Sequence, residues 1–149
     1  MSRDYSRREV LDIIEREARE RSIPREDFLR FAYIETGGAF DERASRGPNG
    51  AKGLFQFVPS TAAHYGIAGR EFDPVANTDA AARLYLDNRR AIAASHTRTG
   101  FPYLSGNPQP DGLDMYMAHQ QGAAGYRSIQ AAIANGSFTR SDTRPNLLN

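Results

Sequence analysis

The chain has 149 residues, of which 40% are hydrophobic, and this is enough for one domain around one apolar core. Its 19 Lys and Arg nearly balance its 18 Asp and Glu without a long run of like charges, which argues against a nucleic-acid-binding surface. The absence of cysteine excludes disulfides, thiolate metal sites and a cysteine nucleophile.

No stretch resembles a signal peptide or a membrane span, because the charged residues 1–9 are followed by no apolar run of the required length. We therefore expect a protein that is made in the cytoplasm, does not insert into a membrane and is carried to its place of action by another system. Residues 1–136 are expected to form one domain, and residues 137–149 a polar C-terminal tail.

The first two predicted helices are amphipathic. In residues 4–21, a stripe at helical spacing recurs among charged residues, and it consists of Val10, Ile13, Ile14, Glu17 and Ala18. A break at residues 22–24 precedes the second helix, for which Ser22 is the predicted N-cap and Pro24 is expected in the first turn. Both helices are expected to pack on the core through one face.

Glu35 lies on the apolar face of the second predicted helix. Phe28, Phe31, Ala32 and Glu35 occupy positions i, i+3, i+4 and i+7, and Gly37-Gly38 then ends the helix. Apolar neighbours and the negative end of the helix dipole both disfavour an ionised carboxylate, so we expect a raised pKa for Glu35. A carboxyl group that stays protonated near neutral pH suits a general acid.

The remainder of the chain also favours helices. A glycine-rich loop over residues 37–53, with room for a minor β-hairpin, and a proline-rich loop over residues 100–112 are the main interruptions. We predict further helices over residues 59–65, 79–95 (capped by Asn77 or Thr78), 111–121 (ending at Gly122) and 125–135. Six to seven helices with little strand indicate a mainly α protein.

Four segments follow one another in a specific order. They are Glu35-Thr36 with Phe40 and Ala44-Ser45; Gly50-Ala51-Lys52-Gly53-Leu54-Phe55-Gln56-Phe57-Val58-Pro59 with Thr61-Ala62; Phe72-Asp73-Pro74-Val75-Ala76-Asn77; and Ala118-His119-Gln120-Gln121-Gly122. Together they resemble the lytic transglycosylase family, which is related to goose-type lysozyme. The resemblance implies a lysozyme-like, mainly α fold in a single compact domain, with a cleft that contains Glu35.

The chain departs from that family's pattern at several points. Gly37-Gly38 lengthen the interval between Glu35 and the nearby Phe, and further replacements occur at Thr36, Phe55, Val58 and His119-Gln120. The last pair replaces a tyrosine and an asparagine, and the family's tyrosine helps to orient the catalytic acid. Such variation resembles phage endolysins and virion-associated murein transglycosylases.

The resemblance implies cleavage of the β-1,4 bond between N-acetylmuramic acid and N-acetylglucosamine in peptidoglycan, with formation of a 1,6-anhydro ring. Glu35 is the implied acid and base, and the candidate substrate-binding residues are Thr36, Ser45, Gln56, Phe57, His119, Gln120 and Gln121. The expected partner is the glycan strand, the protein is expected to be a monomer, and no cofactor is expected. The three histidines lack metal-ligand spacing, so we predict no metal site.

Three alternatives remain open at this stage. Asp41 or Glu42 could supply a second carboxylate, as in many glycosidases, although we favour solvated loop charges because the family resembles the substrate-assisted exceptions. A lysozyme-type hydrolase would share the fold and the substrate. A wall-binding or virion structural module without activity would retain the fold alone, and the presence of Glu35 argues against it.

Overall fold

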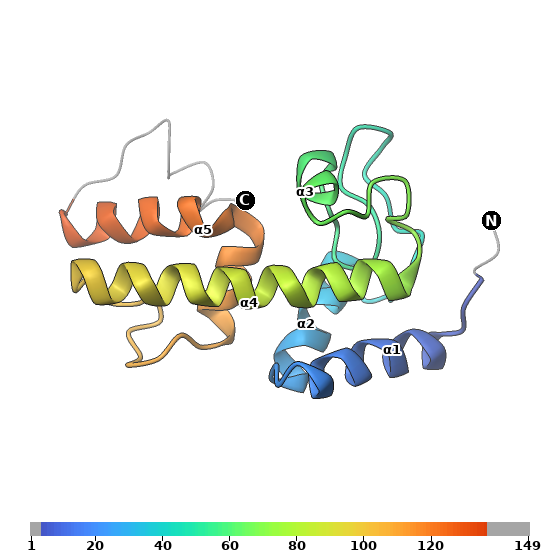
Figure 1. The fold of residues 1–149 in the computed structure, drawn as a ribbon, viewed down its shortest axis with the longest axis horizontal. Coiled ribbons are helices and arrows are strands. Elements are labelled where there is room, and N and C mark those ends of the chain that lie inside the picture. The colour runs from blue at the N-terminus through green and yellow to red at the C-terminus, as the bar shows by residue number, and fades with distance from the viewer. Residues whose placement is uncertain (1–3, 137–149) are drawn as a thin grey trace. The chain divides into compact units, whose positions relative to one another are not determined.

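The computed structural model describes residues 4–136, which form five helices. They are α1 (Arg7–Glu20), α2 (Arg25–Glu35), α3 (Pro59–His64), α4 (Pro74–Thr99) and α5 (Gly112–Ala134) (Figure 1). Within this described range, β structure is limited to two isolated antiparallel bridges, Ser45 with Lys52 and Lys52 with Phe57. The mainly α class is confirmed, with five helices where we predicted six to seven.

The chain divides into two compact units, residues 1–84 and residues 85–149, and the boundary falls within α4. We predicted one domain over residues 1–136, and the predicted polar tail over residues 137–149 lies outside the described residues. No helix of the described part is long and apolar enough to cross a bilayer.

In the first unit, α1 packs against α2 (Figure 1). Ser6 caps α1 in a capping box with Glu9. Of the predicted stripe, the helix buries Val10, Ile14 and Ala18, whereas Ile13 and Glu17 are half-buried. At the start of α2 the cap is Pro24, whereas Ser22 lies in the preceding turn at φ 55°. The prediction of Ser22 as N-cap is therefore wrong. Ser22 adopts left-handed backbone geometry in the turn between the two helices, two residues before the cap position.

Helix α3 begins at Pro59, as predicted, while α4 begins earlier than predicted. The carboxylate of Asp73 accepts hydrogen bonds from the N–H groups of Val75 (2.9 Å) and Ala76 (3.4 Å). Asn77 and Thr78 are buried within the helix instead of capping it. Those two cap predictions are wrong because Pro74 is accommodated in the first turn, where its missing N–H has no cost.

In the second unit, the predicted helices over residues 111–121 and 125–135 form one element with a kink. Gly122 has φ 74° and ψ 163°, so the break expected there exists, and it accounts for the lower helix count. Asp111 caps α5 in a capping box with Asp114. The element therefore consists of two helical segments that meet at Gly122, where the first was predicted to end.

The proline-rich loop between α4 and α5 is tied to α5 by a buried polar network. The carboxylate of Asp114 accepts hydrogen bonds from the N–H and hydroxyl of Ser105 and from the Tyr126 hydroxyl at 2.8 Å. Burial raises the pKa of Tyr126 far above its usual value, so its hydroxyl remains a donor. Gln130 adds bonds to the carbonyls of Phe101 and Pro102. These contacts fix the loop at both ends.

Candidate functional site

Glu35 is the last residue of α2, and only 3% of its side chain is exposed. Phe28, Phe31 and Ala32 are buried on the same face, as the spacing predicted. Gly37 and Gly38 follow with φ of 63° and 86°, the left-handed geometry that ends a helix. The local structure predicted around Glu35 is therefore confirmed.

Arg46 is a charged residue that lies beside Glu35. Its guanidinium lies 3.9 Å from the Glu35 carboxylate, and 61% of its side chain is exposed. The backbone N–H of Arg46 donates to the carbonyl of Ala51 at 2.9 Å, which fixes the turn that carries it. Sequence reasoning missed Arg46, since it lies between Ser45 and Gly50 and matches no motif position.

The turn after Glu35 is organised by Thr36. Its hydroxyl donates to the carbonyl of Ala32 at 2.8 Å and accepts from the N–H of Phe40 at 2.9 Å. Phe40 itself has φ 50°, which a residue with a side chain rarely adopts. Thr36, predicted to bind substrate, thus has a hydroxyl engaged with backbone at the end of α2.

Gln56 lies on a tight turn, at φ 53°, and is only 8% exposed. Its side-chain N–H₂ donates to the carbonyls of Gly53 (2.8 Å) and Ala44 (3.1 Å), which fixes the orientation of the amide. Its Oε1 atom is buried and accepts no hydrogen bond from the described residues. Gln56 is thereby connected, through Ala44, to the segment that carries Arg46.

The turn formed by residues 50–57, here called the motif turn, packs closely against the start of α4. The side chain of Asn77 accepts from the N–H of Phe55 (2.9 Å) and donates to the carbonyls of Glu71 (3.0 Å) and Lys52 (3.3 Å). A Cβ atom at Gly53 would lie 2.2 Å from both Asn77 Nδ2 and the Glu71 carbonyl oxygen. The glycine-rich motif and the segment that contains Asn77, which are separate in sequence, therefore pack directly against each other.

Two further predicted contacts lie in the first unit, in different environments. Ser45 is exposed, and its hydroxyl hydrogen-bonds within its own turn to Gly47. Phe57 is 3% exposed and packs edge-on against Tyr65 with ring centroids 6.3 Å apart. Ser45 is thus accessible to a ligand, whereas Phe57 contributes to the core.

Of the two candidate second carboxylates, Glu42 is 1% exposed. Its Oε2 atom accepts from the N–H groups of Asp4 (3.0 Å) and Tyr5 (3.1 Å). Asp41, which is half-buried, accepts from the N–H of Arg43 at 2.9 Å. The interpretation as a solvated charge is wrong for Glu42, because the N-terminal segment covers it.

The polar residues predicted on α5 belong to the second unit. The rings of Tyr116 and His119 stack with centroids 6.4 Å apart, and the Gln120 amide donates to the Tyr116 hydroxyl at 2.9 Å. Gln121 is half-buried one helical turn before Gly125. His119 and Gln120 therefore form a surface group around Tyr116.

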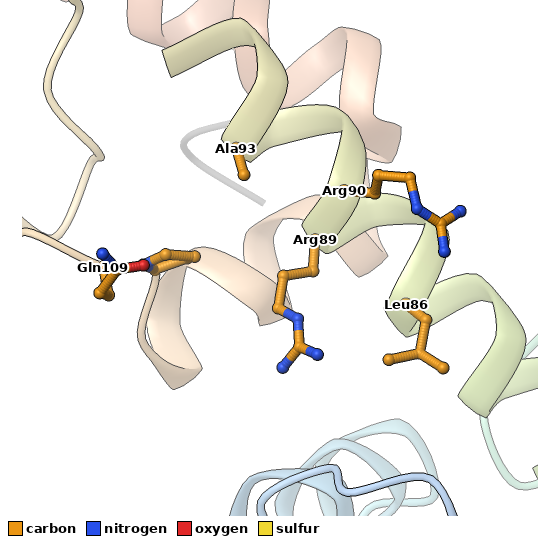
Figure 2. A pocket seen from close by; sticks show the side chains of 6 residues that line it. Leu86, Arg89, Arg90, Ala93 and Gln109 are labelled. Atoms are coloured by element: carbon orange, nitrogen blue, oxygen red, sulfur yellow. The ribbon is translucent and has the colours of Figure 1, made fainter. Parts of the chain in front are cut away.

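A pocket of about 450 Å³ in the second unit contains none of the predicted site residues (Figure 2). It is lined by Leu86, Arg89, Arg90, Ala93, Gln109 and Pro110. In Figure 2 the Arg90 side chain leaves α4 on the side away from Gln109, and Arg90 pairs with Asp87 at 3.4 Å. The guanidinium groups of Arg89 and Arg90 thus do not point toward one common position in the pocket.

The described residues contain no group of three or more His, Asp or Glu side chains arranged to hold a metal ion. The Glu35 carboxyl group is buried with the Arg46 guanidinium 3.9 Å away, and Arg46 lies on the segment that Ala44 connects to Gln56. This arrangement suits proton transfer by a single carboxyl group.

Comparison with known proteins identifies the family. Residues 12–110, about two thirds of the chain, match the Transglycosylase SLT domain. The match contains Glu35, the motif turn and the Asn77 segment, and it ends before α5 with His119, Gln120 and Gln121. Neither the curated proteins nor the solved structures gave a match. The chain therefore belongs to the SLT transglycosylase family, whose substrate is peptidoglycan.

Proposed function

We propose that the protein is a lytic transglycosylase in which Glu35 acts as both general acid and general base. The bond cleaved is the β-1,4 linkage between N-acetylmuramic acid and N-acetylglucosamine, and the product carries a 1,6-anhydro ring. The observation that carries this proposal is a buried carboxyl group at the end of α2, within the residues that match the family.

The reaction requires one proton to leave the carboxyl group and one to return. Glu35 first protonates the glycosidic oxygen, the bond from that oxygen to C1 breaks, and the N-acetyl group of the muramic acid supports the positive C1 centre. The Glu35 carboxylate then removes the proton of the C6 hydroxyl, whose oxygen bonds to C1. The carboxyl group is restored, and no external water is consumed.

Two opposing effects act on the protonation of Glu35. Burial of its side chain, of which 3% is exposed, disfavours the ionised form. The positive charge of Arg46 at 3.9 Å favours the ionised form, although the exposure of that guanidinium weakens the attraction through solvent screening. A carboxyl group under such a balance is suited to a cycle in which it must both lose and regain a proton.

A single carboxylate is consistent with the surroundings. An inverting glycosidase needs a second carboxylate at about 6.5–9.5 Å and a retaining one needs it at about 5 Å. Glu42 holds backbone N–H groups of the N-terminal segment, so its carboxylate is already engaged. This supports a substrate-assisted reaction in preference to a two-carboxylate hydrolysis.

Gln56 is the residue that we propose contacts the sugar in addition to Glu35. Its amide orientation is fixed by two carbonyls, and its Oε1 atom has no donor among the described residues. A buried acceptor without a donor is costly, and the N–H of an N-acetyl group is a donor of matching chemistry for Oε1 once the turn around it opens. The roles of Thr36, Ser45, Phe57, His119, Gln120 and Gln121 in binding stay predictions.

Product analysis tests the proposal. Purified sacculi are digested and the soluble fragments are analysed by mass spectrometry; we expect 1,6-anhydromuramic ends. Reducing ends alone would instead assign a lysozyme-type hydrolase. Glu35→Gln is expected to lower turnover by at least about a thousandfold, since it removes the only proton donor proposed, while circular dichroism shows an unchanged fold.

A second outcome concerns a module without activity. Tight binding to sacculi with no released fragments, by parent and Glu35→Gln alike, would favour a wall-binding or virion module over an enzyme.

We further propose that the biological role is breaching a bacterial wall, as in phage endolysins or virion-associated murein enzymes. The replacements at Thr36, Phe55, Val58 and His119-Gln120 support this subtype by resemblance. Production in a bacterium with and without a co-expressed holin tests it. Lysis that requires the holin supports delivery from the cytoplasm, and lysis in its absence contradicts it.

A further inference from the structure

The segment Asp4–Arg7, here called the N-terminal strap, lies against the loop that follows Glu35. It precedes the family match, which begins at residue 12. Its contacts fall on Gly38, Phe40, Glu42 and Arg43, which span the loop between the end of α2 and the motif turn. The strap is therefore a feature of this chain that the family match does not include.

Glu42 is the centre of this contact. Its carboxylate is buried, and Oε2 accepts the N–H groups of two consecutive strap residues, Asp4 at 3.0 Å and Tyr5 at 3.1 Å. A buried carboxylate is tolerated only when it is well hydrogen-bonded, and bonds to an ionised acceptor are stronger than neutral ones. The Glu42 carboxyl group thus attaches the loop to the strap through two hydrogen bonds.

Arginine side chains reinforce the attachment from both sides. Arg7 of the strap donates to the carbonyl of Gly38 at 3.0 Å, and its guanidinium lies 4.9 Å from the centre of the Phe40 ring. Arg43 of the loop forms an ion pair with Asp4 of the strap. The strap therefore contacts the loop from Gly38 to Arg43.

The loop needs such support because its backbone is unfavourable. Gly37, Gly38 and Phe40 all have positive φ, and for Phe40, at 50°, this conformation is strained. Strained backbone persists only where surrounding contacts determine it. The cation–π contact of Arg7 is made to the ring of this same residue.

The loop leads directly into the site. After Glu42 and Arg43 come Ala44, whose carbonyl accepts from Gly53 N–H (2.8 Å) and Gln56 Nε2 (3.1 Å), and then Arg46 beside Glu35. We propose that the N-terminal strap positions this loop for catalysis, so that Glu42 and Arg7 are positioning residues. The proposal rests on the proposed function, because the step it supports is proton transfer by Glu35.

Kinetics of four variants on solubilised peptidoglycan strands test the proposal: Arg7→Ala, Glu42→Gln, their double variant and the control Arg8→Ala. Each strap variant is expected to lower kcat about tenfold or more with KM within about twofold, because a small misplacement of catalytic groups mainly slows the chemical step. The double variant is expected to lose less than the product of the single losses, since both changes release one loop. Arg8 is exposed, and its variant is expected to match the parent.

Hydrogen exchange provides a measurement that does not depend on activity. In Arg7→Ala and Glu42→Gln, the amides of residues 38–46 are expected to exchange faster while those of α1 keep their protection. If Arg7→Ala and Glu42→Gln keep the parent's kcat and the parent's exchange rates, the proposal that the strap positions the loop is wrong. A loss confined to Glu42→Gln, with Arg7→Ala normal, also overturns it, because that pattern assigns Glu42 to the chemistry itself. If the parent protein cleaves no peptidoglycan, the proposed function fails, and exchange alone decides whether the strap holds the loop.

Discussion

Glu35 and Arg46 show what the sequence reveals about single residues and what it hides. Glu35 was identifiable because helical spacing places it with Phe28 and Phe31, and that pattern is local. Its neighbour Arg46 follows it by eleven positions across a loop with three residues at positive φ, so no periodicity connects the two. The acid was predictable, and the charge that acts on it required the tertiary structure.

Arg46→Ala is expected to change the pH dependence of cleavage. Activity falls on the alkaline side when Glu35 loses the proton that it must donate. Because the positive guanidinium favours the ionised carboxylate, its removal extends activity to higher pH. Rates measured from pH 4 to pH 9 should show the alkaline limb of the Arg46→Ala profile at higher pH than that of the parent. The limb of Arg46→Lys, which keeps the charge, should lie between those of the parent and Arg46→Ala.

The displacement in Arg46→Ala should shrink as salt is added, since the guanidinium is exposed and its field is screened. An alkaline limb at the same pH in parent and Arg46→Ala, at low salt, would show that this guanidinium does not act on Glu35.

Between elements, the contact of the motif turn with α4 explains why two distant motifs occur together. Gly53 is required by close approach, and Asn77 supplies three hydrogen bonds that a buried turn would otherwise lack. From sequence, Asn77 was predicted to cap a helix, because asparagine is frequent at that position. Its actual role depends on the partner segment, which local preference does not contain.

Gly53→Ala is expected to destabilise the protein by about 3 kcal/mol or more, through strain at φ 85° and overlap with Asn77 and the Glu71 carbonyl. Gly66→Ala is the matched control: its φ is 74°, but no atom lies within 4 Å of the added Cβ. The control should therefore show the backbone strain alone, about 1–2 kcal/mol. Urea unfolding followed by circular dichroism measures both, and equal losses would remove the packing explanation.

Asn77→Ala is expected to cost about 2–3 kcal/mol, because the N–H of Phe55 and the carbonyls of Glu71 and Lys52 lose their partner. Asn49→Ala, at an exposed position in the preceding loop, serves as the control and should change the unfolding free energy by less than about 0.5 kcal/mol. A loss for Asn77→Ala no larger than that of the control would contradict the proposed packing of the motif turn against α4.

Over the whole chain, the features that could be predicted depend on residues close in sequence, and the others depend on residues far apart in sequence. The mainly α class, α3 and the break at Gly122 followed from local patterns of proline, glycine and apolar residues. The burial of Glu42 and the anchoring of the proline-rich loop depend on contacts between distant residues. Asp114 is the clearest example. A carboxylate at the start of a helix suggests a capping residue, but the sequence does not indicate that Asp114 is the buried acceptor of a hydrogen-bond network.

Asp114 is expected to make the second unit sensitive to acid. Burial raises the pKa of this carboxyl group, but hydrogen bonds from Ser105, Asp111 and Tyr126 outweigh it, so the pKa lies below the usual 3.8. A depressed pKa means that the ionised form stabilises the folded state above the unfolded pKa, and that this contribution is lost as pH falls through the folded pKa.

Asp114→Asn tests this expectation, because an amide offers one acceptor oxygen to a group of donors and turns its own N–H₂ toward some of them. At pH 7 the variant should lose about 2–4 kcal/mol, with faster exchange of the Leu104 and Ser105 amides that the network holds. Urea unfolding from pH 7 down to pH 2 should show the difference in unfolding free energy narrowing below about pH 4, where Asp114 of the unfolded parent chain begins to be protonated, until the folded form is protonated as well. A difference that stays constant over this range would mean that the charge of Asp114 does not stabilise the loop, and that its contribution comes from shape alone.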